Sequence, residues 1–76
     1  MDSHSIEQLI KEGLPDATVS VRSEDGVHFD ATVASPSFAG KSPLQRHRLV
    51  YATLGSLVGT EIHALSLQTS VSEPDS

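Results

Sequence analysis

The spacing of apolar residues predicts a short amphipathic helix at the start of the chain. Isoleucine and leucine recur at the helical period between residues 6 and 10, which places them on one face. Ser5 is expected to cap this helix, with Gln8 three residues later as the second half of a capping box. Gly13 is the expected end of the helix.

From Ala17 the period of the apolar residues changes to two, which predicts strands. Residues 17–22 alternate apolar and polar side chains, Glu24-Asp25-Gly26 is typical of a hairpin turn, and residues 27–34 form the expected return strand. In that return strand one face would carry Val27, Phe29, Ala31 and Val33, and the other His28, Asp30 and Thr32.

A second and longer helix is expected after a loop over residues 35–41. Ser42 is its predicted cap, Pro43 fits the first turn, and Gln45 completes another capping box. Gly59 is its predicted end. The expected inner face comprises Leu44, Tyr51, Leu54, Leu57 and Val58, widened by Leu49 and Val50.

Residues 61–69 read as a last strand, with Ile62, Ala64, Leu65 and Leu67 as its apolar positions. The order helix, hairpin, helix, strand predicts an α+β domain in which two helices cover one face of a three-stranded sheet. This domain would span residues 1–70. Residues 71–76 are expected to be an acidic, disordered tail.

Composition narrows the functional classes. The 76 residues contain no cysteine, so the chain offers no disulfide, no thiolate nucleophile and no cysteine metal ligand. The start of the chain lacks the pattern of a signal peptide, and no apolar run approaches the roughly 20 residues that cross a bilayer. We therefore expect a cytoplasmic protein that does not enter a membrane.

Charge is distributed unevenly along the chain. The formal net charge is −5, yet residues 31–60 contain no acid and carry +3 from Lys41, Arg46 and Arg48. Net acidity disfavours general nucleic-acid binding, but a local basic face could meet an anion. Gly40 and Lys41 precede a helix as in a phosphate-binding loop, but Ser35 stands where that motif requires its first glycine.

Four histidines are the remaining candidates for chemistry. His4 would lie in a frayed terminus, and His47 lies between two arginines that disfavour its charged form. His28 lies just after the hairpin turn and His63 opens the last strand, so two neutral imidazoles on neighbouring strands could share a metal. Spacing alone does not favour this over ordinary surface histidines.

Nothing in the sequence predicts catalysis. There is no nucleophile elbow and no metalloprotease pair of histidines. The adjacent carboxylates Glu24 and Asp25 lie in a turn, where solvation is their ordinary role. We therefore expect a protein that binds a partner and not an enzyme.

Three motifs follow one another over about the C-terminal half of the chain: Phe38-Ala39-Gly40-Lys41-Ser42, Arg46-His47-Arg48-Leu49-Val50-Tyr51 and Ile62-His63-Ala64-Leu65-Ser66-Leu67. Together and in this order they resemble the BolA family. The preceding helix and hairpin also fit the architecture of that family.

The resemblance implies a fold related to the type II KH domain and a partnership with a monothiol CGFS glutaredoxin. Such heterodimers hold a [2Fe-2S] cluster, for which the glutaredoxin and glutathione supply thiolates, in cluster trafficking or iron sensing. The resemblance assigns His63 as one ligand and, in the histidine subgroup, His28 as the second, with His47 as the alternative. Alone, two imidazoles are too few for a cluster that commonly takes four ligands, so none is expected in the isolated chain.

Two other functions stay open. Some members of the family are described as stress-response transcription regulators, and Lys41, Arg46, His47 and Arg48 would then meet DNA, or equally a partner protein. Pro43 stands where the loop of a nucleic-acid-binding KH domain has its second glycine, which counts against DNA. The third reading is a structural adaptor whose histidines touch no metal. Weak self-association also stays open.

Overall fold

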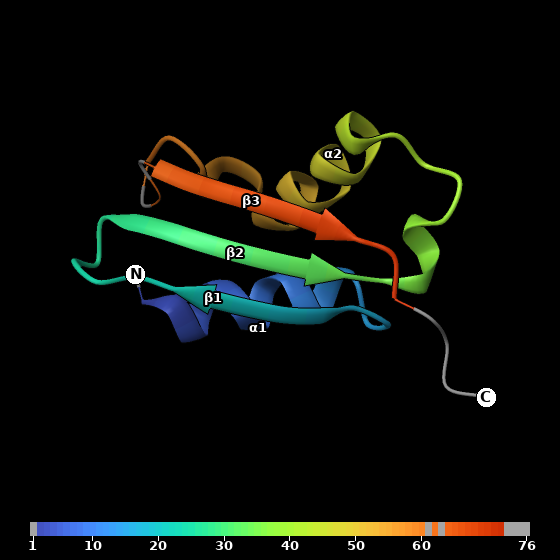
Figure 1. The fold of residues 1–76 in the computed structure, drawn as a ribbon. Coiled ribbons are helices and arrows are strands. Elements are labelled where there is room, and N and C mark those ends of the chain that lie inside the picture. Colours follow the sequence, from blue (N-terminus) through green and yellow to red (C-terminus); the bar gives the residue numbers. More distant parts are fainter. Residues whose placement is uncertain (1, 61, 63, 73–76) are drawn as a thin grey trace.

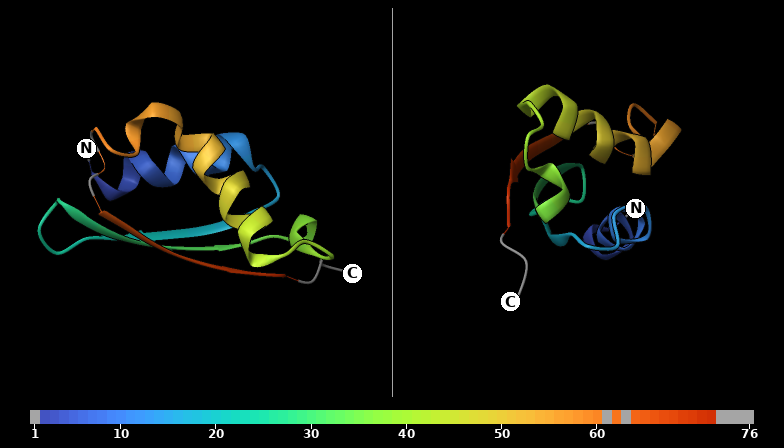
Figure 2. Two further views of the ribbon diagram at one scale, coloured as in Figure 1. Left: turned by 90° about the horizontal axis from the view of Figure 1, so that it is seen from above. Right: turned by 90° about the vertical axis from the view of Figure 1, so that its right-hand side faces the viewer.

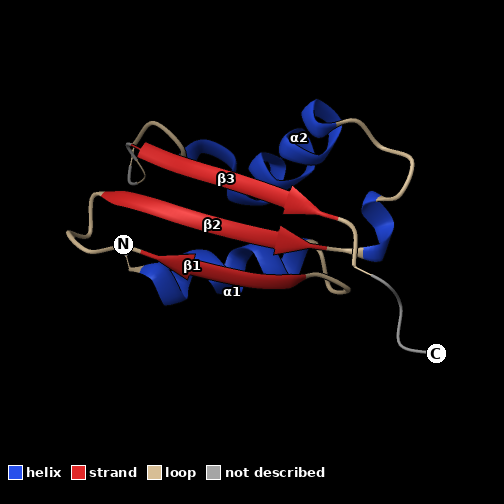
Figure 3. Ribbon diagram, in the orientation of Figure 1, coloured by secondary structure: helices blue, strands red, loops and turns tan. Residues whose placement is uncertain are grey.

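The computed structural model describes residues 2–60, 62 and 64–72 of the chain (Figure 1). Its helices and strands follow the predicted order, with two additional single-turn 3-10 helices (Figure 3). The elements are α1 (Ser3–Gly13), β1 (Thr18–Arg22), β2 (His28–Ala34), η1 (Pro36–Phe38), α2 (Pro43–Leu54), η2 (Gly55–Leu57) and β3 (Ala64–Ser70).

The strands form one mixed sheet in the order β1-β2-β3. β1 and β2 make an antiparallel hairpin in which Val21 pairs with Ala31. β3 lies parallel to β2, so the chain must return through α2 to the end of the sheet at which β2 begins. Both helices cover the same face of the sheet, which confirms the predicted α+β architecture (Figure 2).

The core lies between the helices and that covered face. Strand alternation supplies its lower layer, because Val19, Val21, Phe29, Ala31 and Val33 all point toward the helices. The upper layer comes from α1, α2 and two connections: Ile6, Ile10, Phe38, Val50, Leu54 and Ile62. The opposite face of the sheet carries polar and charged side chains, and no helix among the described residues covers it.

The first helix begins earlier than its capping pattern predicted. Asp2, not Ser5, is the cap: its carboxylate accepts a hydrogen bond from the Ser5 N–H at 2.8 Å. His4 lies within the first turn of α1, and the expected fraying of that turn stays a prediction. An aspartate satisfies free N–H groups at a helix start at least as well as a serine does.

The start of α2 matches its prediction and its end does not. Ser42 and Gln45 form the reciprocal capping box, with bonds of 2.8 and 3.2 Å. The helix ends at Leu54 because Gly55 adopts a positive φ of 59°, so the prediction of a stop at Gly59 was wrong. Two residues expected on the inner face are exposed instead: Leu44 and Val58.

Three further boundaries differ from the predictions. Val27 belongs to the hairpin turn and is exposed, so it does not share the inner face with Phe29. The expected loop before α2 contains the 3-10 turn η1, which inserts Phe38 fully into the core. β3 begins at Ala64, while Ile62 is buried in an isolated bridge to Val58.

At the far end of β3, the Ser72 N–H contacts the Ser35 carbonyl at 3.4 Å. Residues 73–76, which hold the acids of the expected tail, lie outside the described residues. The predicted disorder of that tail therefore stays a prediction.

Candidate functional site

His28 lies at the starting end of β2 and faces away from the helices. Its side chain is 72% exposed. The exposed positions of β2 alternate with Phe29, Ala31 and Val33, which anchor the strand in the core. Strand alternation therefore fixes the direction in which the imidazole projects.

The second predicted ligand, His63, lies outside the described residues. The residues on each side of it in the sequence are described. Ile62 is buried, with its N–H bonded to the Leu57 carbonyl at 2.8 Å. Ala64 is the Cα partner of His28 in the parallel ladder.

The hairpin turn before His28 is organised by the carboxylate of Asp25. Oδ1 accepts hydrogen bonds from the backbone N–H groups of Val27 at 2.9 Å and His28 at 2.8 Å. Oδ2 lies 2.7 Å from Nδ1 of the His28 ring. Gly26 allows the turn by adopting a positive φ of 74°, and its N–H bonds to the Ser23 hydroxyl.

These bonds keep the carboxylate ionised. The pKa of Asp25 lies far below its ordinary value of 3.8, first because the backbone N–H of His28 donates to it, and then because of the His28 ring and the Val27 N–H. Each of these hydrogen bonds is made to the charged form, which they stabilise over the neutral acid. Asp25 is a functional candidate that the sequence did not predict, because solvation is the ordinary role of a carboxylate in a turn. The sequence predicted the turn itself, and an Asp three residues before a candidate ligand is the pattern that could have indicated this contact.

The predicted basic residues lie on the loop before α2 and on α2 itself. Lys41 and Arg48 line a shallow hollow of about 310 Å³ together with Gln45 and Leu49. Arg46 is half-buried, and among the described residues its Nε has no hydrogen-bond partner. His47 is also half-buried on α2, so it belongs to the helical layer, whereas His28 projects from the uncovered face of the sheet.

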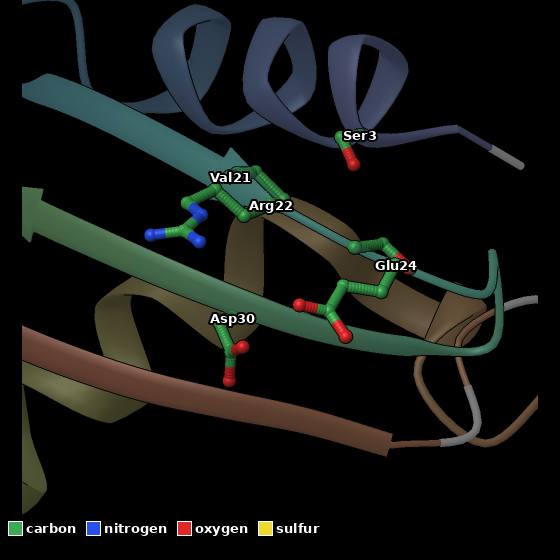
Figure 4. A pocket seen from close by; sticks show the side chains of 6 residues that line it. Ser3, Val21, Arg22, Glu24 and Asp30 are labelled. Atoms are coloured by element: carbon green, nitrogen blue, oxygen red, sulfur yellow. The ribbon is translucent and has the colours of Figure 1, made fainter.

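A second shallow hollow, of about 350 Å³, adjoins the hairpin (Figure 4). Arg22, Glu24 and Asp30 bring charges of both signs to it. Arg22 and Asp30 are cross-strand partners in the ladder. Mixed charge on an open surface selects no particular ligand.

A complete metal site is not present among the described residues. In residues 2–60, 62 and 64–72, no three His, Asp or Glu side chains gather closely enough to hold a metal ion. The imidazole of His28 is nevertheless a suitable donor, because histidine replaces cysteine as an iron ligand in some [2Fe-2S] centres. Its exposure leaves room for ligands from another molecule. In the same described part of the chain, no helix has the length and apolar character needed to span a bilayer.

Comparisons with known proteins agree with this fold. The sequence model of the BolA-like protein family matches residues 3–73. The chain is 47% identical to a solved BolA protein homologue from Coxiella burnetii, with a TM-score of 0.82, over 93% of this chain and 91% of that one. It therefore belongs to the family of BolA-like proteins.

Two curated relatives carry informative names. Human BolA-like protein 1 is 38% identical over an alignment of 73 positions, which covers 84% of this chain and 53% of the human protein. The DNA-binding transcriptional regulator BolA of Vibrio cholerae is 50% identical over 42 residues, 55% of this chain and 40% of the regulator. The chain thus spans about half the length of the human relative.

Proposed function

We propose that this protein is the BolA-like partner of a monothiol CGFS glutaredoxin and shares a [2Fe-2S] cluster with it. In this proposal the shared cluster serves iron-sulfur cluster trafficking or iron sensing in the cytoplasm. No residue of the chain is proposed to be catalytic. His28 and His63 are its proposed ligands, with thiolates from glutaredoxin and glutathione completing the set. The cluster is cargo held between the two proteins.

The observation that carries the proposal is the placement of His28. An exposed imidazole stands at one end of the sheet, on a strand that is anchored in the core, and its ladder partner is the residue that follows His63. Imidazole is a borderline donor that iron accepts. A rigid strand is a better support for a ligand than a flexible loop, because it fixes the direction of the donor atom.

His47 is the weaker choice for the second ligand. It is half-buried on α2 and belongs to the helical layer. His28, by contrast, is the ladder partner of the residue that follows His63. This placement supports the choice of His28 made from the family resemblance.

Reconstitution tests the proposal. The chain and a CGFS glutaredoxin are incubated anaerobically with glutathione, iron and sulfide, and the visible absorption and circular dichroism spectra are recorded. We expect a spectrum that differs from that of the glutaredoxin homodimer and changes in the His28→Ala and His63→Ala variants. The matched control is His47→Ala, which should keep the wild-type spectrum. Identical spectra for wild type and both ligand variants would refute the ligand assignment.

A second candidate function is DNA binding, favoured by the name of the Vibrio cholerae relative and by the basic hollow of Lys41 and Arg48. Two cations on one surface could contact neighbouring phosphates. We expect any such binding to be weak, because the whole chain carries a net charge of −5. A gel-shift titration of duplex DNA at several salt concentrations measures whether the chain binds DNA. A salt-dependent shift by wild type that is lost in Lys41→Ala and Arg48→Ala would favour DNA over cluster binding.

A structural adaptor is the remaining alternative. If the protein is an adaptor, the variant that combines His28→Ala and His63→Ala should still form the glutaredoxin complex, and the spectrum of that complex should be unchanged. Size-exclusion chromatography of the same samples measures both the complex and any weak homodimer of the isolated chain.

A further inference from the structure

A single carboxylate holds both the backbone and the ring of His28. Oδ1 of Asp25 accepts the His28 backbone N–H at 2.8 Å, and Oδ2 lies 2.7 Å from the Nδ1 atom of the same residue. The Val27 N–H adds a third contact, at 2.9 Å to Oδ1. The two oxygens therefore have separate tasks: one shapes the turn and the other contacts the imidazole.

The chemistry of the pair determines which ring nitrogen carries the proton. An ionised carboxylate is only an acceptor, so the short contact requires Nδ1 to be the donor. In a neutral imidazole the other nitrogen, Nε2, then keeps a free lone pair. The side chain is 72% exposed, and Nε2 forms no hydrogen bond with any described residue.

We propose that Asp25 is a positioning residue that presents Nε2 of His28, and not Nδ1, as the atom that binds iron. This inference rests on the proposed function, since it names the donor atom within the shared site. Histidine ligands of metals commonly donate their second ring nitrogen to a carboxylate, which fixes both the tautomer and the orientation of the ring. Here that carboxylate is three residues earlier in the same turn, so the hairpin carries both the ligand and its support.

Asp25→Asn separates the two tasks of the carboxylate. The amide oxygen of asparagine can still accept the backbone N–H groups of Val27 and His28, so the turn is retained. The amide nitrogen then takes the place of Oδ2 and is a donor. It would bond to an unprotonated Nδ1 and leave the proton on Nε2, which reverses the tautomer.

The first measurement uses the isolated chain and no cluster. Long-range proton–nitrogen NMR correlations identify the protonated ring nitrogen of His28, in alkaline solution where a free imidazole is neutral. We expect the proton on Nδ1 in wild type and on Nε2 in Asp25→Asn, with the Val27 and His28 backbone amide signals little changed. Glu24→Gln is the matched control: it removes the same charge from the adjacent residue and should keep the wild-type tautomer.

The second measurement uses the complex with the CGFS glutaredoxin. We expect Asp25→Asn to weaken retention of the cluster roughly ten- to hundredfold, the usual effect of losing a residue that orients a metal ligand. Glu24→Gln should behave as wild type. Retention is followed by the decay of visible absorption during titration with an iron chelator.

The outcomes distinguish failure of this inference from failure of the proposed function. A wild-type proton on Nε2, or an unchanged tautomer in Asp25→Asn, overturns the positioning role. So does cluster retention that falls in His28→Ala but not in Asp25→Asn, a result that leaves the proposed function standing. If His28→Ala retains the cluster as wild type does, the ligand assignment itself fails, whatever the tautomer.

Discussion

Gly13, the last residue of α1, touches the other helix, and replacing it with alanine should destabilise the protein. Its φ is not positive, so an alanine would fit the backbone. On helix propensity alone Gly13→Ala would gain about 1 kcal/mol. A methyl group built there would instead lie 2.4 Å from Cγ2 and 2.9 Å from Cβ of Thr53 in α2.

Thr53 cannot easily move away from such a methyl group. It is β-branched, and its hydroxyl donates a hydrogen bond to the Val50 carbonyl at 2.6 Å. The two helices would have to separate, and overpacking of this kind costs about 1–3 kcal/mol. Subtracting the gain of about 1 kcal/mol in propensity from this cost leaves an expected net loss of up to about 2 kcal/mol.

Urea unfolding followed by far-ultraviolet circular dichroism measures this loss. Thr53→Ser keeps the hydroxyl and removes Cγ2, so Gly13→Ala should be far less harmful in that background. We expect a coupling of about 1 kcal/mol between the two sites. If Gly13→Ala is more stable than wild type by the full gain in propensity of about 1 kcal/mol, or if the coupling is absent, the close approach of the two helices at this point is refuted.

Three further predictions concern the core, the cap and acid stability. Phe38→Ala should cost about 3–5 kcal/mol, because the ring is fully buried, and the urea midpoint should fall sharply. Ser42→Ala should cost about 1 kcal/mol through loss of the Gln45 N–H bond, visible as a smaller shift of the same midpoint. Folding lowers the pKa of Asp25 below its ordinary 3.8, so the unfolded chain binds more protons there. The resulting stability is present above about pH 5 and is lost as the pH falls below it; a parallel acid series should show a shallower loss for Asp25→Asn than for wild type.

Local patterns predicted the parts of the fold that local chemistry controls. The capping box of Ser42 and Gln45 involves residues three apart, so the sequence contains all of it. The end of α2 was harder to predict, because Gly55 and Gly59 both suit a helix stop and both adopt a positive φ. The choice between them depends on how the chain packs onto the core and on the bonds that Ile62 makes with Leu57 and Gly59.

The candidate site was predictable only in part, for the same reason. The direction of the His28 side chain follows from alternation along a strand. The contact of its ring with Asp25 depends instead on the three-dimensional form of the turn. Val27 was placed on the wrong face because period-two counting does not reveal where a strand begins. The assignment of His63 came from the family resemblance and stays a prediction.

The parallel pairing of β2 with β3 has a consequence for folding. The β1–β2 hairpin joins near neighbours in the sequence, but His28 meets Ala64 only after the whole crossover through α2 has closed. Closing so long a loop is slow relative to hairpin formation. β3 is also synthesised after both the hairpin and the crossover. The end of the sheet that holds His28 is therefore completed late, so that a growing chain would present its hairpin histidine well before the neighbouring strand is in place.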